Sequence, residues 1–194
     1  MKRCFLPLGL FAMLIATGCR IQVDKAKNGD DKNVKIDTPM GGLHVRTNQM
    51  TAADVGLPVY PGAQIFSDHD DKPADIHMGF GKWQLRVKVV SYQTSDSQDK
   101  VLDFYHKNLG RYGDVIECRG DNVVGTPTTT SEGLTCSNSK SEHVNLNEKD
   151  ELSLRAGSKH HQHIVGIKNT GSGTKFALVE LELPNIDEGS QDSQ

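Results

Sequence analysis

The sequence is poor in aromatic residues and has no excess of basic charge. Phe, Trp and Tyr make up 6% of its 194 residues, and Trp83 is the one tryptophan. The formal net charge is −3, with both signs interspersed along the chain. A nucleic-acid-binding protein commonly shows a basic stripe, and many also have aromatic side chains on which bases stack. The composition therefore argues against nucleic acid as a partner.

The motifs of common catalytic and cofactor sites are also missing. The chain has no G-x-S-x-G nucleophile elbow, no phosphate-binding loop and no dinucleotide fingerprint. The acidic stretch Ser67–Asp75 lacks the regular spacing of a calcium loop, and Pro73 interrupts it. We therefore predict no cofactor and favour a protein that is not an enzyme. A hydrolase with an unrecognised site stays open, because catalytic groups converge in space without converging in sequence.

The first 18 residues have the order of a secretory signal. Lys2 and Arg3 precede an apolar segment from Phe5 to Thr17, which is shorter than the ~20 residues of a membrane-spanning helix. The segment ends in the letters ATGC, which resemble the lipobox of bacterial lipoproteins. That resemblance implies cleavage before Cys19 and attachment of several acyl chains, such as palmitate, to this cysteine. The alternative is a simple secretory signal, and both readings predict export.

Three features extend the lipoprotein interpretation along the chain. Arg20 follows the cysteine, where lipoproteins of the inner membrane often carry Asp, so the resemblance favours the outer membrane, with the domain facing the periplasm. Residues 19–33 are polar and charged, and we predict a flexible tether behind the lipidated Cys19. We expect an exported domain over residues 34–184 and a disordered tail over 185–194.

The cysteines fit an oxidising compartment. Cys4 lies in the signal and Cys19 in the lipobox, so the exported domain keeps only Cys118 and Cys136. Exported proteins hold disulfides, whereas cytosolic ones seldom do, and we predict that this pair is bonded. A thiol metal site is the weaker alternative, because neither cysteine belongs to a C-x-x-C pair.

Hydrophobic periodicity predicts strands over most of the chain and one helix. In Trp83–Thr94, apolar and polar residues alternate as in a strand with one buried face. Between Ser95 and Gly110, apolar residues recur at helical spacing. Three more strands in meander order follow after Glu151. We predict a single α+β domain, mainly an antiparallel sheet with one main amphipathic helix packed on it.

Two segments in the middle of the chain carry a family resemblance. The letters GLPVYPGA precede a strand, and the helix after that strand contains Phe104-Tyr105 followed by Leu109. This order resembles a set of uncharacterised bacterial envelope lipoproteins that share a Tyr-Pro-Gly-Ala segment and a Phe-Tyr-x-x-x-Leu helix. The resemblance implies an α+β periplasmic module and no catalytic residues.

The densest group of possible metal ligands is His160, His161 and His163. In an extended strand, His161 and His163 lie on one face, close enough for one ion to touch both, while His160 and Gln162 face away. Two imidazoles supply half of a zinc site, so a further ligand must come from elsewhere in the fold. Without that ligand, the histidines are the solvated polar edge of a strand. The remaining candidates along the chain are His44, His69, Asp70, Asp75 and His77.

Together these features predict a lipid-anchored, periplasm-facing envelope protein. We expect a non-catalytic binding or structural module whose partners are the membrane, through its lipid anchor, and another envelope protein. The alternative is a metal-binding lipoprotein that holds zinc or copper with His161 and His163.

Overall fold

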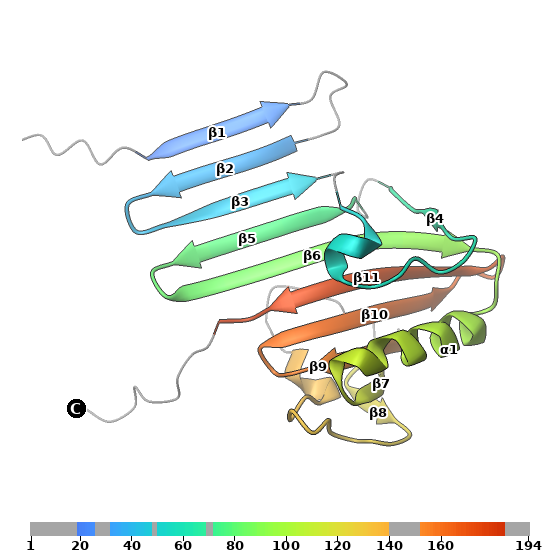
Figure 1. The fold of residues 1–194 in the computed structure, drawn as a ribbon. Helices are drawn as coiled ribbons and strands as arrows, with labels where there is room; N and C mark the ends of the chain where they lie inside the picture. Colours follow the sequence, from blue (N-terminus) through green and yellow to red (C-terminus); the bar gives the residue numbers. More distant parts are fainter. Residues whose placement is uncertain (1–18, 26–31, 48–49, 69–71, 140–151, 185–194) are drawn as a thin grey trace, which may run out of the picture.

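The protein is built on one long antiparallel sheet (Figure 1). The structure, a computed structural model, describes residues 19–25, 32–47, 50–68, 72–139 and 152–184. The sheet has the strand order β1-β2-β3-β5-β6-β11-β10-β9-β7-β8, and the short β4 pairs with β6. The strands are β1 Arg20–Lys25, β2 Lys32–Thr38, β3 Gly41–Thr47, β4 Gln64–Ile65, β5 Ala74–Phe80, β6 Trp83–Thr94, β7 Val115–Arg119, β8 Asn122–Val124, β9 Leu152–Gly157, β10 His161–Asn169 and β11 Thr174–Glu182.

The main core lies between the second half of the sheet and its helices. Helix α1 (Gln98–Leu109) packs against β9 and β10, and the 3₁₀ helix η1 (Ala52–Val55) packs against β6 and β11. Helix α1 turns Val101, Tyr105 and Leu109 toward the sheet, at the i, i+4, i+8 spacing of one helical face. The strands contribute buried residues including Val90, Tyr92, Leu154, Val165, Ile167, Phe176 and Leu178.

The first strands form a wing, which we define as β1, β2, β3 and β5. Residues that lie directly opposite each other on adjacent antiparallel strands share a face of the sheet, so they form rows across the wing. One row runs Ile21, Ile36, Leu43, Met78 and, on β6, Leu85. The next runs Val23, Val34, Val45, Ile76 and Val87. One face of the wing is therefore apolar, while its other face carries polar residues such as Lys35, His44 and Asp75.

The disulfide between Cys118 and Cys136 is present, as predicted. Cys118 lies on β7 and Cys136 opens the 3₁₀ helix η3 (Cys136–Ser139), with 5.6 Å between their Cα atoms. Both sulfurs belong to a small buried cluster with Ile116 and Leu134. Arg155 of β9 is buried beside this cluster and donates from Nη1 to the Cys136 carbonyl at 3.0 Å.

The predicted antiparallel sheet with one main helix is confirmed, but the share of strand residues is higher than the predicted α+β class implies. Strands make up 51% of the residues that the structure describes, and these residues include a single α-helix, so mostly-β describes the fold better than α+β. The described helices include none with the length and hydrophobicity that a membrane crossing requires.

The segment expected to be a flexible tether contains strands. Arg20–Lys25 forms β1 and Lys32 starts β2, with Ile21 opposite Ile36 and Val23 opposite Val34. Two apolar residues in a charged segment are a weak strand signal, and pairing with β2 supplies the missing stabilisation. Residues 26–31, the expected signal at 1–18 and the expected tail at 185–194 lie outside the described residues.

We expect the disulfide to contribute substantially to stability. Replacing both Cys118 and Cys136 with Ala should lower the free energy of unfolding by about 3 kcal/mol, because the bond closes a loop between cysteines 18 positions apart and so restricts the unfolded chain. Urea unfolding of the two proteins measures the difference. Equal unfolding midpoints at equal slopes would contradict this assignment.

Candidate metal centre

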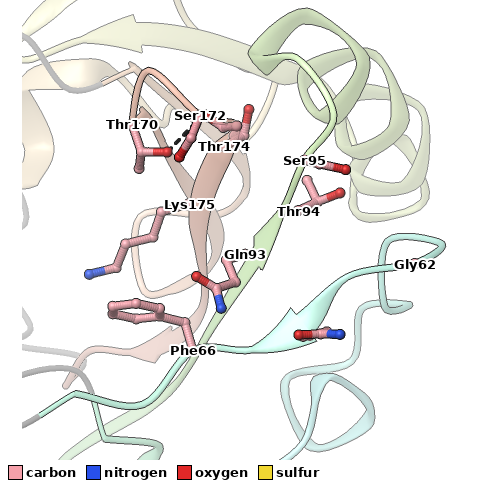
Figure 2. A pocket seen from close by; sticks show the side chains of 11 residues that line it. Gly62, Phe66, Gln93, Thr94, Ser95, Thr170, Ser172, Thr174 and Lys175 are labelled. Carbon is pink, nitrogen blue, oxygen red and sulfur yellow. Dashed lines mark hydrogen bonds between the residues drawn. The ribbon is translucent and has the colours of Figure 1, made fainter.

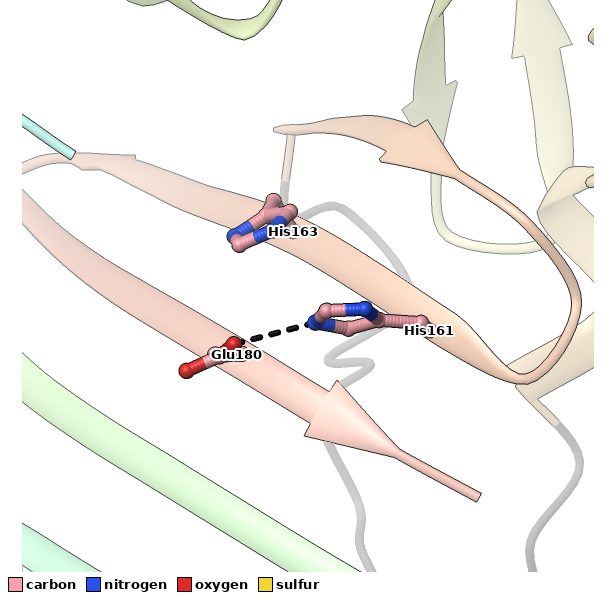
Figure 3. Close-up of side chains that lie close together, drawn as sticks. All are labelled: His161, His163 and Glu180. Atoms are coloured by element: carbon pink, nitrogen blue, oxygen red, sulfur yellow. Dashed lines mark hydrogen bonds and ion pairs between the residues drawn. The ribbon is translucent and has the colours of Figure 1, made fainter. Parts of the chain in front are cut away.

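Strands β10 and β11 bring His161, His163 and Glu180 together (Figure 3). His163 and Glu180 are direct neighbours across the two strands, and His161 lies two positions from His163 on the same face. One candidate ligand atom from each side chain lies within 4.8 Å of the other two. Glu180 Oε1 accepts from His161 Nε2 at 3.0 Å. Among the described residues, this is the one group of three or more His, Cys, Asp or Glu side chains arranged so that they could share an ion.

His163 is the buried member of the cluster, with 4% of its surface exposed. Its Nδ1 lies 3.2 Å from the carbonyl oxygen of Val55. A carbonyl only accepts, so Nδ1 carries the proton, and in the neutral ring Nε2 keeps a lone pair. Burial lowers the pKa of His163, and the nearby His161 and Arg111 act in the same direction, against the opposing effects of Glu180 and the Val55 carbonyl. The ring is therefore held neutral, which is the form that binds a metal.

Tyr112 covers His163 on the side of η1. The two rings are stacked, with centroids 3.6 Å apart and planes inclined by 21°. The Tyr112 hydroxyl donates to the Gly56 carbonyl at 2.6 Å, which fixes the phenol ring. Gly56 ends η1 with a φ of 77°, and a Cβ at this position would lie 2.6 Å from the Tyr112 hydroxyl oxygen. Only glycine satisfies both the left-handed backbone and this close approach.

The start of η1 is fixed by its own cap. The carboxylate of Asp54 accepts from the backbone N–H and the hydroxyl of Thr51, at 2.9 and 2.6 Å. These bonds lower the pKa of Asp54. The cap orients the turn that carries the Val55 carbonyl toward His163, and it thereby contributes to the orientation of the imidazole.

Glu180 is held between two donors. Besides His161, it accepts from the ammonium of Lys88 on β6, which also donates to the Asp54 carbonyl at 3.0 Å. Burial on its own raises the pKa of Glu180, but the bonds from Lys88 and His161 outweigh this effect, and the pKa lies below its usual value. The carboxylate is consequently ionised in the neutral pH range, as a metal ligand must be.

The structure separates the other candidate ligands from this cluster. His160 precedes β10 and is exposed, and Gln162 points to the opposite face, as the strand geometry predicted. His44 and His77 lie opposite each other on β3 and β5, and Asp75 pairs with Arg86. His69 and Asp70 lie outside the described residues.

Sequence reasoning missed Glu180, although a signal was present. In β11 the residues Phe176, Leu178 and Glu180 share one face, and the first two belong to the main core. A carboxylate on the same strand face as core residues is unusual, because an ionised group that is removed from water needs a charged or hydrogen-bonding partner. The pairing register that brings Glu180 opposite His163 was not accessible from spacing alone.

Two imidazoles and one carboxylate form a ligand set suited to zinc or copper. Ligand atoms around a tetrahedral zinc ion lie about 3.3 Å apart, since each bond is ~2.0 Å long. The ligand atoms lie within 4.8 Å of one another, so the widest pair must approach by up to about 1.5 Å to bind one zinc ion. A bound ion would take the place of the proton that His161 Nε2 donates to Glu180, and the exposed side would admit water as a fourth ligand.

A cavity lies beside the end of β6 and the start of β11 (Figure 2). Its volume is about 420 Å³, and hydroxyl and amide side chains, including Gln93, Thr94 and Ser172, line it together with Lys175 and Phe66. The Lys175 ammonium lies 4.1 Å from the centroid of the Phe66 ring. Among the described residues that line the cavity there is no His, Cys, Asp or Glu, so these residues supply neither a metal-ligand set nor a carboxylate or imidazole base.

No protein-family model, curated protein or solved structure matches this chain. The residues of the cluster and their geometry are therefore the basis for a function.

We predict energetic coupling between Lys88 and Glu180 in the metal-free protein. Lys88→Met leaves the buried carboxylate without its ammonium, and Glu180→Gln leaves the ammonium without its carboxylate, so each change should be more destabilising than the pair of changes together. The coupling free energy should be about 2 kcal/mol. Urea unfolding of both single variants and the double variant measures it. Single effects that add would show that the two side chains do not depend on each other.

Proposed function

We propose that the protein is an exported, lipid-anchored binding module that holds one zinc or copper ion with His161, His163 and Glu180. The observation that carries the proposal is the meeting of these three side chains on adjacent strands. It supplies the third ligand that a pair of histidines lacks. Imidazole nitrogen with one carboxylate oxygen favours zinc or copper over magnesium or calcium, which prefer oxygen ligands throughout.

The surroundings of the cluster support metal binding. Metal-bound histidines almost always donate their second ring N–H to a carbonyl or carboxylate, which sets the tautomer and the ring orientation. His163 already donates from Nδ1 to Val55, and Tyr112 holds the ring from above. The buried His163 is held in a fixed orientation, and the exposed His161 leaves a path by which an ion can enter from solvent.

The same surroundings favour binding over catalysis. Lys88 is engaged with Glu180 and with the Asp54 carbonyl, and the Tyr112 hydroxyl is engaged with Gly56. These groups hold the ligands and the turn above them. Many hydrolytic metal sites add a positioned general acid or base to the ligands, whereas Lys88 and Tyr112 are both engaged in supporting this cluster.

Export and lipid anchoring complete the proposal. Cys19 is exposed and directly precedes β1. The disulfide between Cys118 and Cys136 suits an oxidising compartment such as the periplasm. We propose an outer-membrane anchor, the sheet domain on the periplasmic side, and another envelope protein as the acceptor or donor of the ion.

Titration of the purified protein with Zn²⁺ tests the metal site. We expect one ion per chain with a Kd tighter than about 1 µM, which corresponds to about −8 kcal/mol. Changing both His161 and His163 to Ala should abolish this binding, and Glu180→Gln should weaken it strongly, because each change removes a ligand. Isothermal titration calorimetry measures the three affinities, with Cu²⁺ in a parallel series.

The matched control is His160→Ala, which removes a neighbouring exposed imidazole that lies outside the cluster. It should leave the affinity unchanged. Equal affinities for the wild-type protein and the His161/His163 double variant would disprove the site, and so would an equal loss in the His160 control.

Production of the full chain in a bacterium tests the anchor separately. We expect cleavage before Cys19 and a mass increase on the first peptide of the mature protein that matches a diacylglyceryl group plus an acyl chain. Cys19→Ser should abolish both the added mass and recovery with the membrane fraction. An unmodified Cys19 in mature protein would contradict lipid anchoring and leave the metal site untouched.

A further inference from the structure

The sheet begins directly behind the cysteine that we propose is acylated. Strand β1 starts at Arg20, so the described structure leaves no linker between Cys19 and the first strand. One residue of extended chain spans about 3.5 Å. Acyl chains on Cys19 lie in the hydrocarbon of the bilayer, which places the start of β1 at the level of the lipid headgroups. A domain on a flexible tether would have no such constraint.

Two hairpin turns lie at the same end of the sheet as Cys19 (Figure 1). Strand β1 leaves this end, β2 returns to it, and the turn at residues 39–40 leads into β3. Strand β5 also ends here, and the turn at residues 81–82 leads into β6. We call this part of the sheet the anchor end: the residues of β1, the two turns, and the Phe80–Trp83 pair that flanks the second turn.

Exposed apolar side chains gather at the anchor end. Seven large apolar residues are exposed in the part of the chain that the structure describes, and four of them belong to the anchor end. Met40, at the first turn, is 83% exposed, and Phe80, beside the second, is 51% exposed. On β1, Ile21 and Val23 are 65% and 50% exposed. A soluble surface rarely concentrates its large apolar residues in this way.

The remaining features of the anchor end suit a lipid interface. Trp83 lies opposite Phe80, with ring centroids 6.0 Å apart, and tryptophan is enriched at the headgroup level of membranes. Lys82 is exposed at the second turn and Arg20 at the start of β1, where cations meet lipid phosphates. Neither turn carries an acidic residue.

We propose that the anchor end inserts its exposed apolar side chains into the surface of the bilayer to which Cys19 is attached. This inference rests on the lipid anchoring proposed above. It adds a second attachment, by protein side chains, and it orients the sheet with the turns at 39–40 and 81–82 toward the lipid. Acyl chains on Cys19 keep these side chains at the interface, so even modest burial of Met40 and Ile21 contributes to attachment.

The bilayer fits this surface better than a second copy of the chain. The exposed apolar side chains lie beside the attachment point, at the two turns and along the edge strand β1 of the wing's apolar face. Every copy of the protein would hold this end at the membrane, where lipid is the neighbour in excess.

The single tryptophan allows a direct test. The full chain is produced in a bacterium, so that Cys19 is processed, and is reconstituted into phosphatidylethanolamine–phosphatidylglycerol vesicles whose acyl chains carry bromine. Because bromine quenches indole emission only at short range, we expect loss of most of the Trp83 fluorescence relative to vesicles without bromine. The test variant replaces Ile21 and Met40 with Ser and leaves Phe80, the neighbour of Trp83, in place. It should recover a large part of the emission.

A matched control replaces Val59 and Ile65 with Ser. Both are exposed apolar residues, and Ile65 pairs with Tyr92 near the opposite end of β6. This variant should be quenched like the wild-type protein, and equal thermal unfolding of all three proteins in detergent verifies their folding.

Three results would overturn the proposal. Trp83 of acylated protein could keep its emission in brominated vesicles and remain accessible to aqueous iodide. Trp83 could be protected from iodide without quenching by bromine, in a concentration-dependent manner, which would indicate a second copy. Mass spectrometry could find Cys19 unmodified, which removes the premise and is distinguished from the other two results by the mass itself.

Discussion

The pairing register of β10 with β11 is the constraint on which both the core and the candidate metal centre depend. It sets Val165 opposite Leu178 and Ile167 opposite Phe176, so that these apolar side chains meet under helix α1. The same register sets His163 opposite Glu180. A slip of one residue would turn every side chain of a strand to the other face, and it would expose the core and disperse the cluster together. Burial of the apolar residues therefore stabilises the arrangement of the polar ones.

The cluster lies where the covered part of the sheet ends. Helix α1 and η1 bury the strands beside it, while His161 stays exposed at the start of β10. Such a position lets burial hold His163 neutral and lets Lys88 hold Glu180 ionised, without closing the site to solvent. The ring of His163 is surrounded by groups from distant parts of the chain: the Val55 carbonyl, the turn at Gly56, and Tyr112, each more than 50 residues before His163. The first two reach the ring because η1 packs on the sheet.

The wing extends the sheet beyond its helices and has two unlike faces. Its polar face pairs charges such as Asp75 with Arg86, and its apolar face continues the rows of side chains from β6 outward to β1. In the proposed arrangement, the anchor end lies at the bilayer and the covered half of the sheet carries the metal ion. The proposed metal ligands lie on β10 and β11, whereas the exposed apolar residues of the anchor end lie on β1, at the 39–40 turn and at the end of β5.

Much of this protein was predictable from local sequence. Alternation identified β6, helical spacing identified α1, and the cysteine count identified the disulfide, because each depends on neighbours in sequence or on a single possible pair. Strand geometry also predicted that His161 and His163 share a face and that His160 does not. Glu180 escaped because its approach to His163 depends on pairing between strands, and β1 escaped because Ile21 and Val23 are stabilised mainly by their partners on β2. The sequence by itself determined the strands with a clear apolar alternation, the helix, and which residue types are available as ligands. The tertiary structure alone decided which of them meet, because register and the packing of η1 are set by burial across the whole sheet.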